Sequence, residues 1–168
     1  MKHKKLIGRK PVRFWIRDEI EEIIKDKNID RTRFHEYSKL RYRGIIQKFL
    51  SSFCIGKGAA TRQESLEGMS LCFIPSLENR VIDCFFRTDN WNEYLNSIRQ
   101  EIPQGVDRLF LLLDEGWVYE GYVDELFVVL GECSGNLEDF YIVSQKFDWF
   151  ISSVEDNAVF FRRGGGRD

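Results

Sequence analysis

Acidic and aromatic side chains are concentrated in one stretch of the chain, residues 114–125. Trp and Tyr supply rigid contact area at protein interfaces, and carboxylates attract a basic partner and speed its association. We therefore expect this stretch to bind a basic protein. The candidate partner-binding residues are Asp114, Glu115, Trp117, Tyr119, Glu120, Asp124 and Glu125, and the acidic set continues through Glu132, Glu138, Asp139, Asp148, Glu155 and Asp156. The alternative is a hairpin tip whose aromatic side chains fill the core while its acids face water.

The formal net charge of −2 conceals two oppositely charged halves. Residues 1–60 carry 16 Lys and Arg against 7 Asp and Glu, a balance of +9, whereas residues 61–168 carry 9 against 20, a balance of −11. Such asymmetry concerns partners and association rather than fold. It predicts an acidic docking face, a basic nucleic-acid face, or two halves that pack together and neutralise each other.

The basic half offers a second candidate interface. Cations follow one another along a predicted helix, and a helix of this kind can contact phosphates. The alternative nucleic-acid face consists of Arg31, Arg41, Arg43 and Lys48. No helix-turn-helix pattern accompanies it, so nucleic-acid binding is the second hypothesis.

Motifs for catalysis or metal binding are missing from the sequence. The chain has 2 His, neither beyond position 35, and its 4 Cys form no CxxC pair. Zinc sites and calcium loops require ligands at recognisable spacings. The Gly-containing segment around Lys57 lacks the spacing of a phosphate loop and follows a predicted helix. We therefore predict no enzymatic activity, no metal and no cofactor, and we expect the cysteines to be small buried side chains, although a Cys72–Cys84 disulfide is conceivable.

Hydrophobic periodicity predicts helices in the first third of the chain and near its middle. Ile16, Ile20, Ile23 and Ile24 lie on one face of a helix over residues 14–27. Asp30 is a favourable N-cap for a second, longer helix that ends near Gly56. Two further helices are predicted, one capped by Asp89 and containing residues 91–98, the other spanning residues 123–130 with Gly131 at its end.

Strands are predicted between and after these helices. Residues 70–74 and 81–86 form a predicted hairpin, and so do residues 108–113 and 117–119, joined by the turn Asp114-Glu115-Gly116. The 108–113 run is apolar without alternation, which indicates burial on both faces of a sheet. Three more strands are expected at residues 140–143, 149–154 and 158–161.

This order predicts an α+β fold: two N-terminal helices, then a mainly antiparallel sheet of hairpins with interspersed short helices (ββα, ββα, ββ). The length suits a single domain over residues 1–168, with a basic N-terminal arm at 1–13 and a Gly-rich tail at 163–168. No apolar run is long enough for a membrane span, and the N-terminus lacks the pattern of a secretory signal. We therefore expect a cytoplasmic protein.

The last third of the chain resembles small uncharacterised bacterial proteins. The residues that carry the resemblance are Gly131-Glu132-Cys133 and the aromatic strand, Lys-containing turn and Trp of residues 139–149. They also resemble, more loosely, the immunity proteins encoded beside bacterial toxins. The resemblance implies a protein that binds another protein. The sequence thus favours a non-enzymatic module that occludes a basic toxin, and exposed aromatic side chains would equally suit a homodimer.

Overall fold

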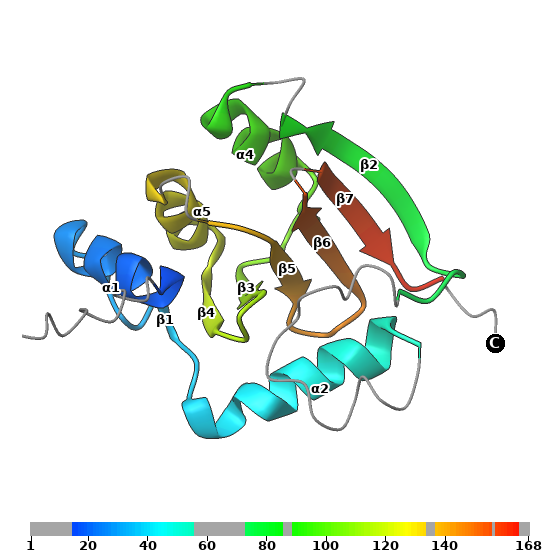
Figure 1. Ribbon diagram of the computed structural model, residues 1–168, viewed down its shortest axis with the longest axis horizontal. Helices are drawn as coiled ribbons and strands as arrows, with labels where there is room; N and C mark the ends of the chain where they lie inside the picture. The colour runs from blue at the N-terminus through cyan, green and yellow to red at the C-terminus, as the bar shows by residue number, and fades with distance from the viewer. Residues whose placement is uncertain (1–14, 56–72, 86–88, 134–136, 156, 165–168) are drawn as a thin grey trace, which may run out of the picture.

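An antiparallel sheet of seven strands forms the centre of the protein (Figure 1). The computed structural model describes residues 15–55, 73–85, 89–133, 137–155 and 157–164. The strand order is β1-β4-β3-β5-β6-β7-β2, and every neighbouring pair is antiparallel. The strands are β1 (Phe34–Glu36), β2 (Glu78–Cys84), β3 (Arg108–Leu113), β4 (Val118–Tyr122), β5 (Phe140–Ser144), β6 (Trp149–Val154) and β7 (Asn157–Arg162). The α+β class with an antiparallel sheet is confirmed.

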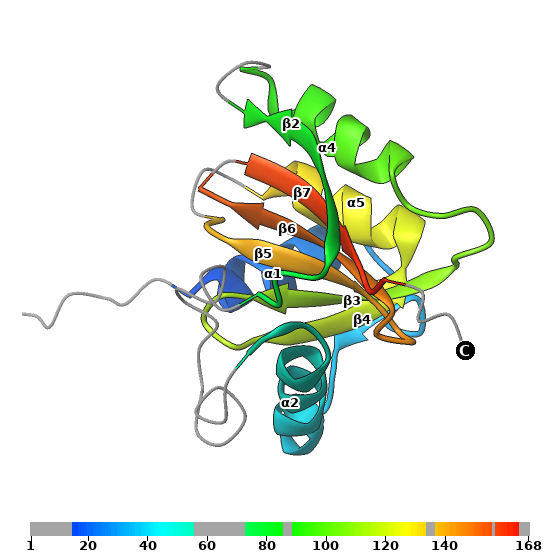
Figure 2. The ribbon, with the colours of Figure 1, turned by 90° about the vertical axis from the view of Figure 1, so that its right-hand side faces the viewer.

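Helices cover both faces of this sheet (Figure 2). The helices are α1 (Ile16–Asp26), α2 (Tyr42–Phe53), α4 (Trp91–Gln100) and α5 (Val123–Glu132), and a short 3-10 helix, η1 (Lys39–Arg41), precedes α2. Helices α1, α4 and α5 pack on one face, and α2 packs on the other.

Strand β3 shows how the two cores share one sheet. Leu109, Leu111 and Leu113 belong to the core beneath α1, α4 and α5, while Phe110 and Leu112 belong to the core beneath α2. Successive side chains of a strand point to opposite faces, so a strand covered on both sides needs an unbroken apolar run. The predicted burial of residues 108–113 on both faces is confirmed for Leu109–Leu113.

The predicted second helix is wrong at its start. The carboxylate of Asp30 accepts a hydrogen bond from the Thr32 backbone N–H (2.8 Å), so it closes a turn rather than capping a helix. Phe34 then lies in β1, where it pairs with β4 and stacks fully buried on Tyr119. Edge pairing and burial at β4 outweigh the helical spacing, and the helix begins only at Tyr42. The two N-terminal helices are therefore separated by a strand.

The predicted hairpin of residues 70–74 and 81–86 is also not found among the described residues. Strand β2 pairs instead with β7, the last strand of the chain. Phe73 makes an isolated bridge to Cys54, and residues 70–72 lie outside the described part of the chain. Local spacing favours a hairpin partner close in the sequence, whereas the partner strand of β2 lies about half the chain away.

Several boundaries differ by a few residues. Asn90 rather than Asp89 caps α4, because its side chain accepts from the Glu93 backbone N–H (3.1 Å). Helix α5 continues through Gly131 to Glu132. Helix α1, the β3–β4 hairpin and strands β5, β6 and β7 form where the sequence predicts them. The basic arm, Cys72 and residues 165–168 lie outside the described residues, and Cys54 and Cys133 are buried free cysteines.

Gly121 and Gly44 make a matched test of the β1–β4 pairing. A Cβ at Gly121 would lie 2.4 Å from the Arg33 carbonyl oxygen and 2.8 Å from the Phe34 Cα, both backbone atoms of the neighbouring segment. We expect Gly121→Ala to lower the free energy of unfolding by about 1–3 kcal/mol through overpacking. Gly44→Ala meets nothing within 4 Å and lies in a helix, so it should raise that energy by up to about 1 kcal/mol. Urea denaturation measures both, and equal effects would contradict the close approach.

Candidate functional site

An acidic pocket of about 320 Å³ opens at one end of the sheet. It is lined by Trp91, Asp114, Leu137, Glu138, Asp139, Ser153 and Glu155. The sheet register brings these residues together, because Leu113 pairs with Phe140 and Phe140 pairs with Ser153. The end of β3, the start of β5 and the end of β6 therefore meet at the same edge.

Backbone contacts fix the acidic rim. The Asp114 N–H donates to the Asp139 carbonyl oxygen (3.3 Å), which ties the β3–β4 turn to the start of β5. The Glu155 N–H donates to Oδ1 of Asp139 (3.0 Å), which ties the β6–β7 turn to the same residue. Asp139 thus has a structural role, whereas Glu138 and Glu155 are exposed at the rim.

One wall of the pocket is held by buried groups. The Trp91 indole donates to the Leu130 carbonyl oxygen (2.9 Å), and its ring stacks on Tyr94. The Tyr94 hydroxyl is hydrogen-bonded to the Ser153 hydroxyl (2.8 Å) in the interior. The indole and serine therefore keep fixed positions at the pocket wall.

The carboxylates of the pocket repel one another. Burial, followed by the nearby charge of Glu138, raises the pKa of Asp114 to about 6. Both causes disfavour the charged form, as expected where carboxylates share a partly desolvated site. No Lys, Arg or His is among the lining residues, and no ion pair within the described residues involves Glu138, Asp139 or Glu155. A bound cation would relieve this repulsion.

A metal ion is a poorer fit to the structure. In the described ranges no group of three or more His, Cys, Asp and Glu side chains is arranged to hold one. The rim acids Glu138 and Glu155 come from separate segments of the chain. Asp139 already accepts a backbone hydrogen bond. The pocket chemistry suits an organic cation with an apolar stem, because Trp91 and Leu137 contribute apolar surface beside the carboxylates.

The structure divides the predicted acidic-aromatic face. Asp114 lies in the pocket, but Tyr119 is fully buried under α1, where its hydroxyl donates to Glu21 (3.0 Å). Trp117 packs edge-on against Trp15 and Tyr42 and donates to Glu115 (3.2 Å). The prediction that the aromatic residues form one exposed face with the acids is therefore wrong for Tyr119, whose ring fills the core.

The remaining predicted acids pair with cations of this chain. Glu120 accepts from Gln145 (2.8 Å) and lies 3.4 Å from an Arg108 guanidinium nitrogen, on the α2 side of the sheet. On α5, Asp124 pairs with Arg99 and Glu125 with Arg33. The structure thus does not bring these acids together with Asp114.

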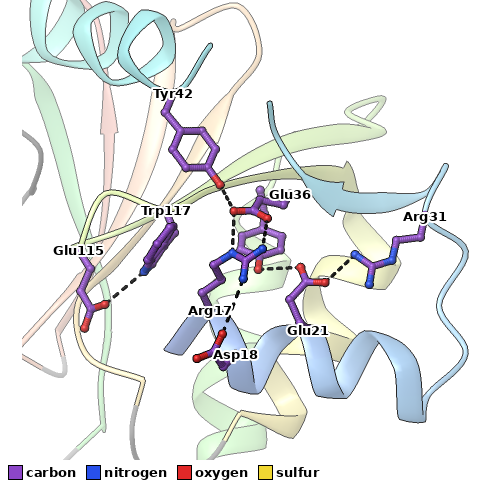
Figure 3. A network of polar contacts seen from close by, with 9 residues as sticks. Arg17, Asp18, Glu21, Arg31, Glu36, Tyr42, Glu115 and Trp117 are labelled. Atoms are coloured by element: carbon purple, nitrogen blue, oxygen red, sulfur yellow. Dashed lines mark hydrogen bonds and ion pairs between the residues drawn. The ribbon is translucent and has the colours of Figure 1, made fainter. Parts of the chain in front are cut away.

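A network of polar contacts joins α1, β1 and the start of α2 (Figure 3). Arg17 makes two hydrogen bonds to Glu36, at 2.8 and 2.7 Å, and the Tyr42 hydroxyl donates to the same carboxylate. Burial opposes the charged form of Glu36, but the hydrogen bonds from Arg17 and Tyr42 prevail and lower its pKa. The two-pronged geometry is the strong form of an Arg–carboxylate pair, and it fixes where the chain passes from one face of the sheet to the other.

The predicted basic residues also separate. Arg31 pairs with Glu21 (2.7 Å), so it belongs to the same internal network (Figure 3). Arg41, Arg43 and Lys48 are exposed, and no ion pair among the described residues involves them. The two halves of the chain therefore neutralise each other only in part, through pairs such as Lys27–Glu132 and Arg33–Glu125.

Sequence reasoning missed the apolar and neutral half of the pocket. In the sequence Trp91 is only part of the predicted helix that contains residues 91–98, and Leu137 and Ser153 belong to no motif. Glu138, Asp139 and Glu155 were visible as acids. They meet at one edge because β5 pairs with both β3 and β6. That pairing can be known only once the order of the strands in the sheet is known.

Fold and pocket define the protein as an α+β protein whose one antiparallel sheet is covered on both faces and carries an acidic pocket at its edge. The chain belongs to DUF6756, a family of unknown function, whose family model matches residues 13–164. The comparisons with curated proteins and with solved structures returned no match. None of the helices in the described residues has the length and hydrophobicity that a membrane span requires.

The raised pKa of Asp114 predicts a pH-dependent stability. A folded-state pKa of about 6 exceeds the unfolded value, so the protonated carboxyl stabilises the fold at low pH and this contribution is lost as the pH rises through about 6. Relative to the wild type, Asp114→Asn should therefore have a higher free energy of unfolding at about pH 7.5 than at about pH 4.5. These two pH values bracket the transition. Urea denaturation at the two pH values measures the difference.

A carboxyl-carbon NMR titration provides the control. In the wild type Asp114 should titrate near pH 6, and Glu138→Gln should move that midpoint to lower pH because one repelling charge is removed. If Glu138→Gln leaves the midpoint unchanged, the charge of Glu138 is not a cause of the raised pKa of Asp114.

Proposed function

We propose that this protein is a non-enzymatic protein-binding module that holds a cationic side chain of a partner protein in its acidic pocket. The observation that carries the proposal is the pocket itself: four carboxylates, Asp114, Glu138, Asp139 and Glu155, surround about 320 Å³ of space beside Trp91 and Leu137, and no cation is among the lining residues.

A lysine or arginine side chain has the chemistry that this pocket accommodates. Its aliphatic stem would pack against Trp91 and Leu137, and its charged end would meet the rim carboxylates. Binding would also convert Asp114 to its charged form, because an opposite charge lowers a carboxyl pKa. Partner binding should therefore release protons near pH 6, where the Asp114 carboxyl is half protonated.

Within this proposal, the partner is a basic bacterial toxin and the protein acts in the cytoplasm as its immunity protein. A basic active site that binds an anionic substrate would be blocked when one of its cations is held by the pocket. The loose resemblance of residues 131–133 and 139–149 to immunity-type proteins, which is an expectation from the sequence, motivates this finer hypothesis. A co-purified toxin would be the direct demonstration.

Charge neutralisation at the rim tests the pocket. We expect Glu138→Gln/Glu155→Gln to weaken binding of an arginine-rich peptide by about tenfold, since charge-assisted contacts contribute roughly 1.5–3 kcal/mol. Asp139 is left intact because it supports the Glu155 backbone. Isothermal titration calorimetry measures the affinity, and the Trp91 indole resonance should shift on binding in the wild type.

Glu22→Gln/Glu78→Gln is the matched control. Both of its acids are exposed, lie outside the pocket and change the net charge by the same amount. The control should bind as the wild type does. If both double variants lose the same affinity, the peptide is held by overall charge and the pocket is not the site.

A further inference from the structure

The segment from η1 to the end of α2 carries cations and no acids. Between residues 37 and 55 the charged side chains are Lys39, Arg41, Arg43 and Lys48, and no Asp or Glu occurs. All of these cations are exposed, and no ion pair among the described residues involves them, whereas Arg17, Arg31 and Arg33 pair with carboxylates. We call Lys39, Arg41, Arg43 and Lys48 the α2 cationic surface.

The apolar side of α2 is buried against the sheet. Ile46, Phe49, Leu50 and Phe53 are buried in the core on this face, and α2 lies outside the sheet as a separate layer (Figure 2). The outward side chains include Gln47, Lys48 and Ser51, all with hydrogen-bond donors, while Gly44 faces open space. The exposed face of α2 therefore presents donors and positive charge.

The electrostatic field at the start of α2 is reinforced by the helix itself. Arg41 and Arg43 lie at the N-terminal end, where the helix dipole is positive, and the first turn contains no acid to offset it. Lys48 is placed one to two turns further on, with its ammonium 5.0 Å from the centre of the Phe147 ring. Cations are thus spread from η1 along α2, on a rigid core.

We propose that the α2 cationic surface binds the phosphate backbone of duplex DNA. From Lys39 to Lys48 the cations extend over about 14 Å, close to the width of the B-DNA major groove of about 12 Å, so they can reach phosphates along its edges. Lysine and arginine contacts to phosphates release counterions and give sequence-independent affinity. A lipid surface fits less well, because the apolar face of α2 is already buried in the core. In the described part of this segment, Leu40 and Ile55 are the large apolar side chains that stay exposed.

Fluorescence anisotropy with a labelled random-sequence duplex of about 20 base pairs tests the proposal, at salt concentrations from about 50 to 200 mM. The wild type should bind with an affinity that falls steeply with salt. Arg41→Ala/Arg43→Ala/Lys48→Ala should bind at least about tenfold more weakly and reduce the slope of log affinity against log salt by about 3.

Lys25→Ala/Arg162→Ala/Arg163→Ala is the matched control, because it removes the same number of charges from exposed positions outside α2, and no ion pair among the described residues involves these three cations. It should retain wild-type affinity and slope. Equal loss in both triple variants would overturn the proposal, as would no binding by the wild type at about 50 mM salt. Binding to phosphatidylserine vesicles with none to the duplex would overturn it in favour of a membrane surface.

Discussion

The structure depends on one constraint: the middle strands of the sheet are apolar on both faces, so both faces must be covered. Leu109–Leu113 of β3 and all of β5 are buried. One helix layer cannot satisfy this, and the chain supplies α1, α4 and α5 on one side and α2 on the other. The polypeptide must therefore cross from one face to the other between α1 and α2. Strand β1 makes that crossing, and the Arg17–Glu36–Tyr42 contacts fix it.

This crossing determines where the charges of the molecule are displayed. The cations before β1, such as Arg17 and Arg31, remain near acids of α1 and β1 and pair with them. The cations after it lie on η1 and α2, in a segment without acids, and stay exposed. At the sheet end near Asp114, strand register gathers acids, and no cation is among the described residues that line the pocket there. A nearly neutral chain thus presents an acidic pocket and a basic helix as separate features, each suited to a partner of opposite charge.

Much of the fold could be predicted because its signals are local. The isoleucines of α1 repeat with helical spacing, and the apolar run of β3 followed by Asp114-Glu115-Gly116 defines a hairpin. The start of the second helix could not be predicted in the same way, because Phe34 has helical spacing to Tyr37 and yet is buried in an edge strand against Tyr119. Likewise, β2 pairs with β7, and no local pattern specifies a partner so far along the chain.

The sequence by itself determined the α+β class, the doubly buried strand and the separation of positive from negative charge along the chain. Only the tertiary structure decided which charges lie beside an opposite charge and which lie beside like charges. Glu120, Asp124 and Glu125 look equivalent to Asp114 in sequence, but each lies against a cation contributed by another element, whereas Asp114 lies among carboxylates. The physical reason is that hydrophobic periodicity acts between near neighbours, while ion pairing and strand register join residues that only the completed sheet brings together.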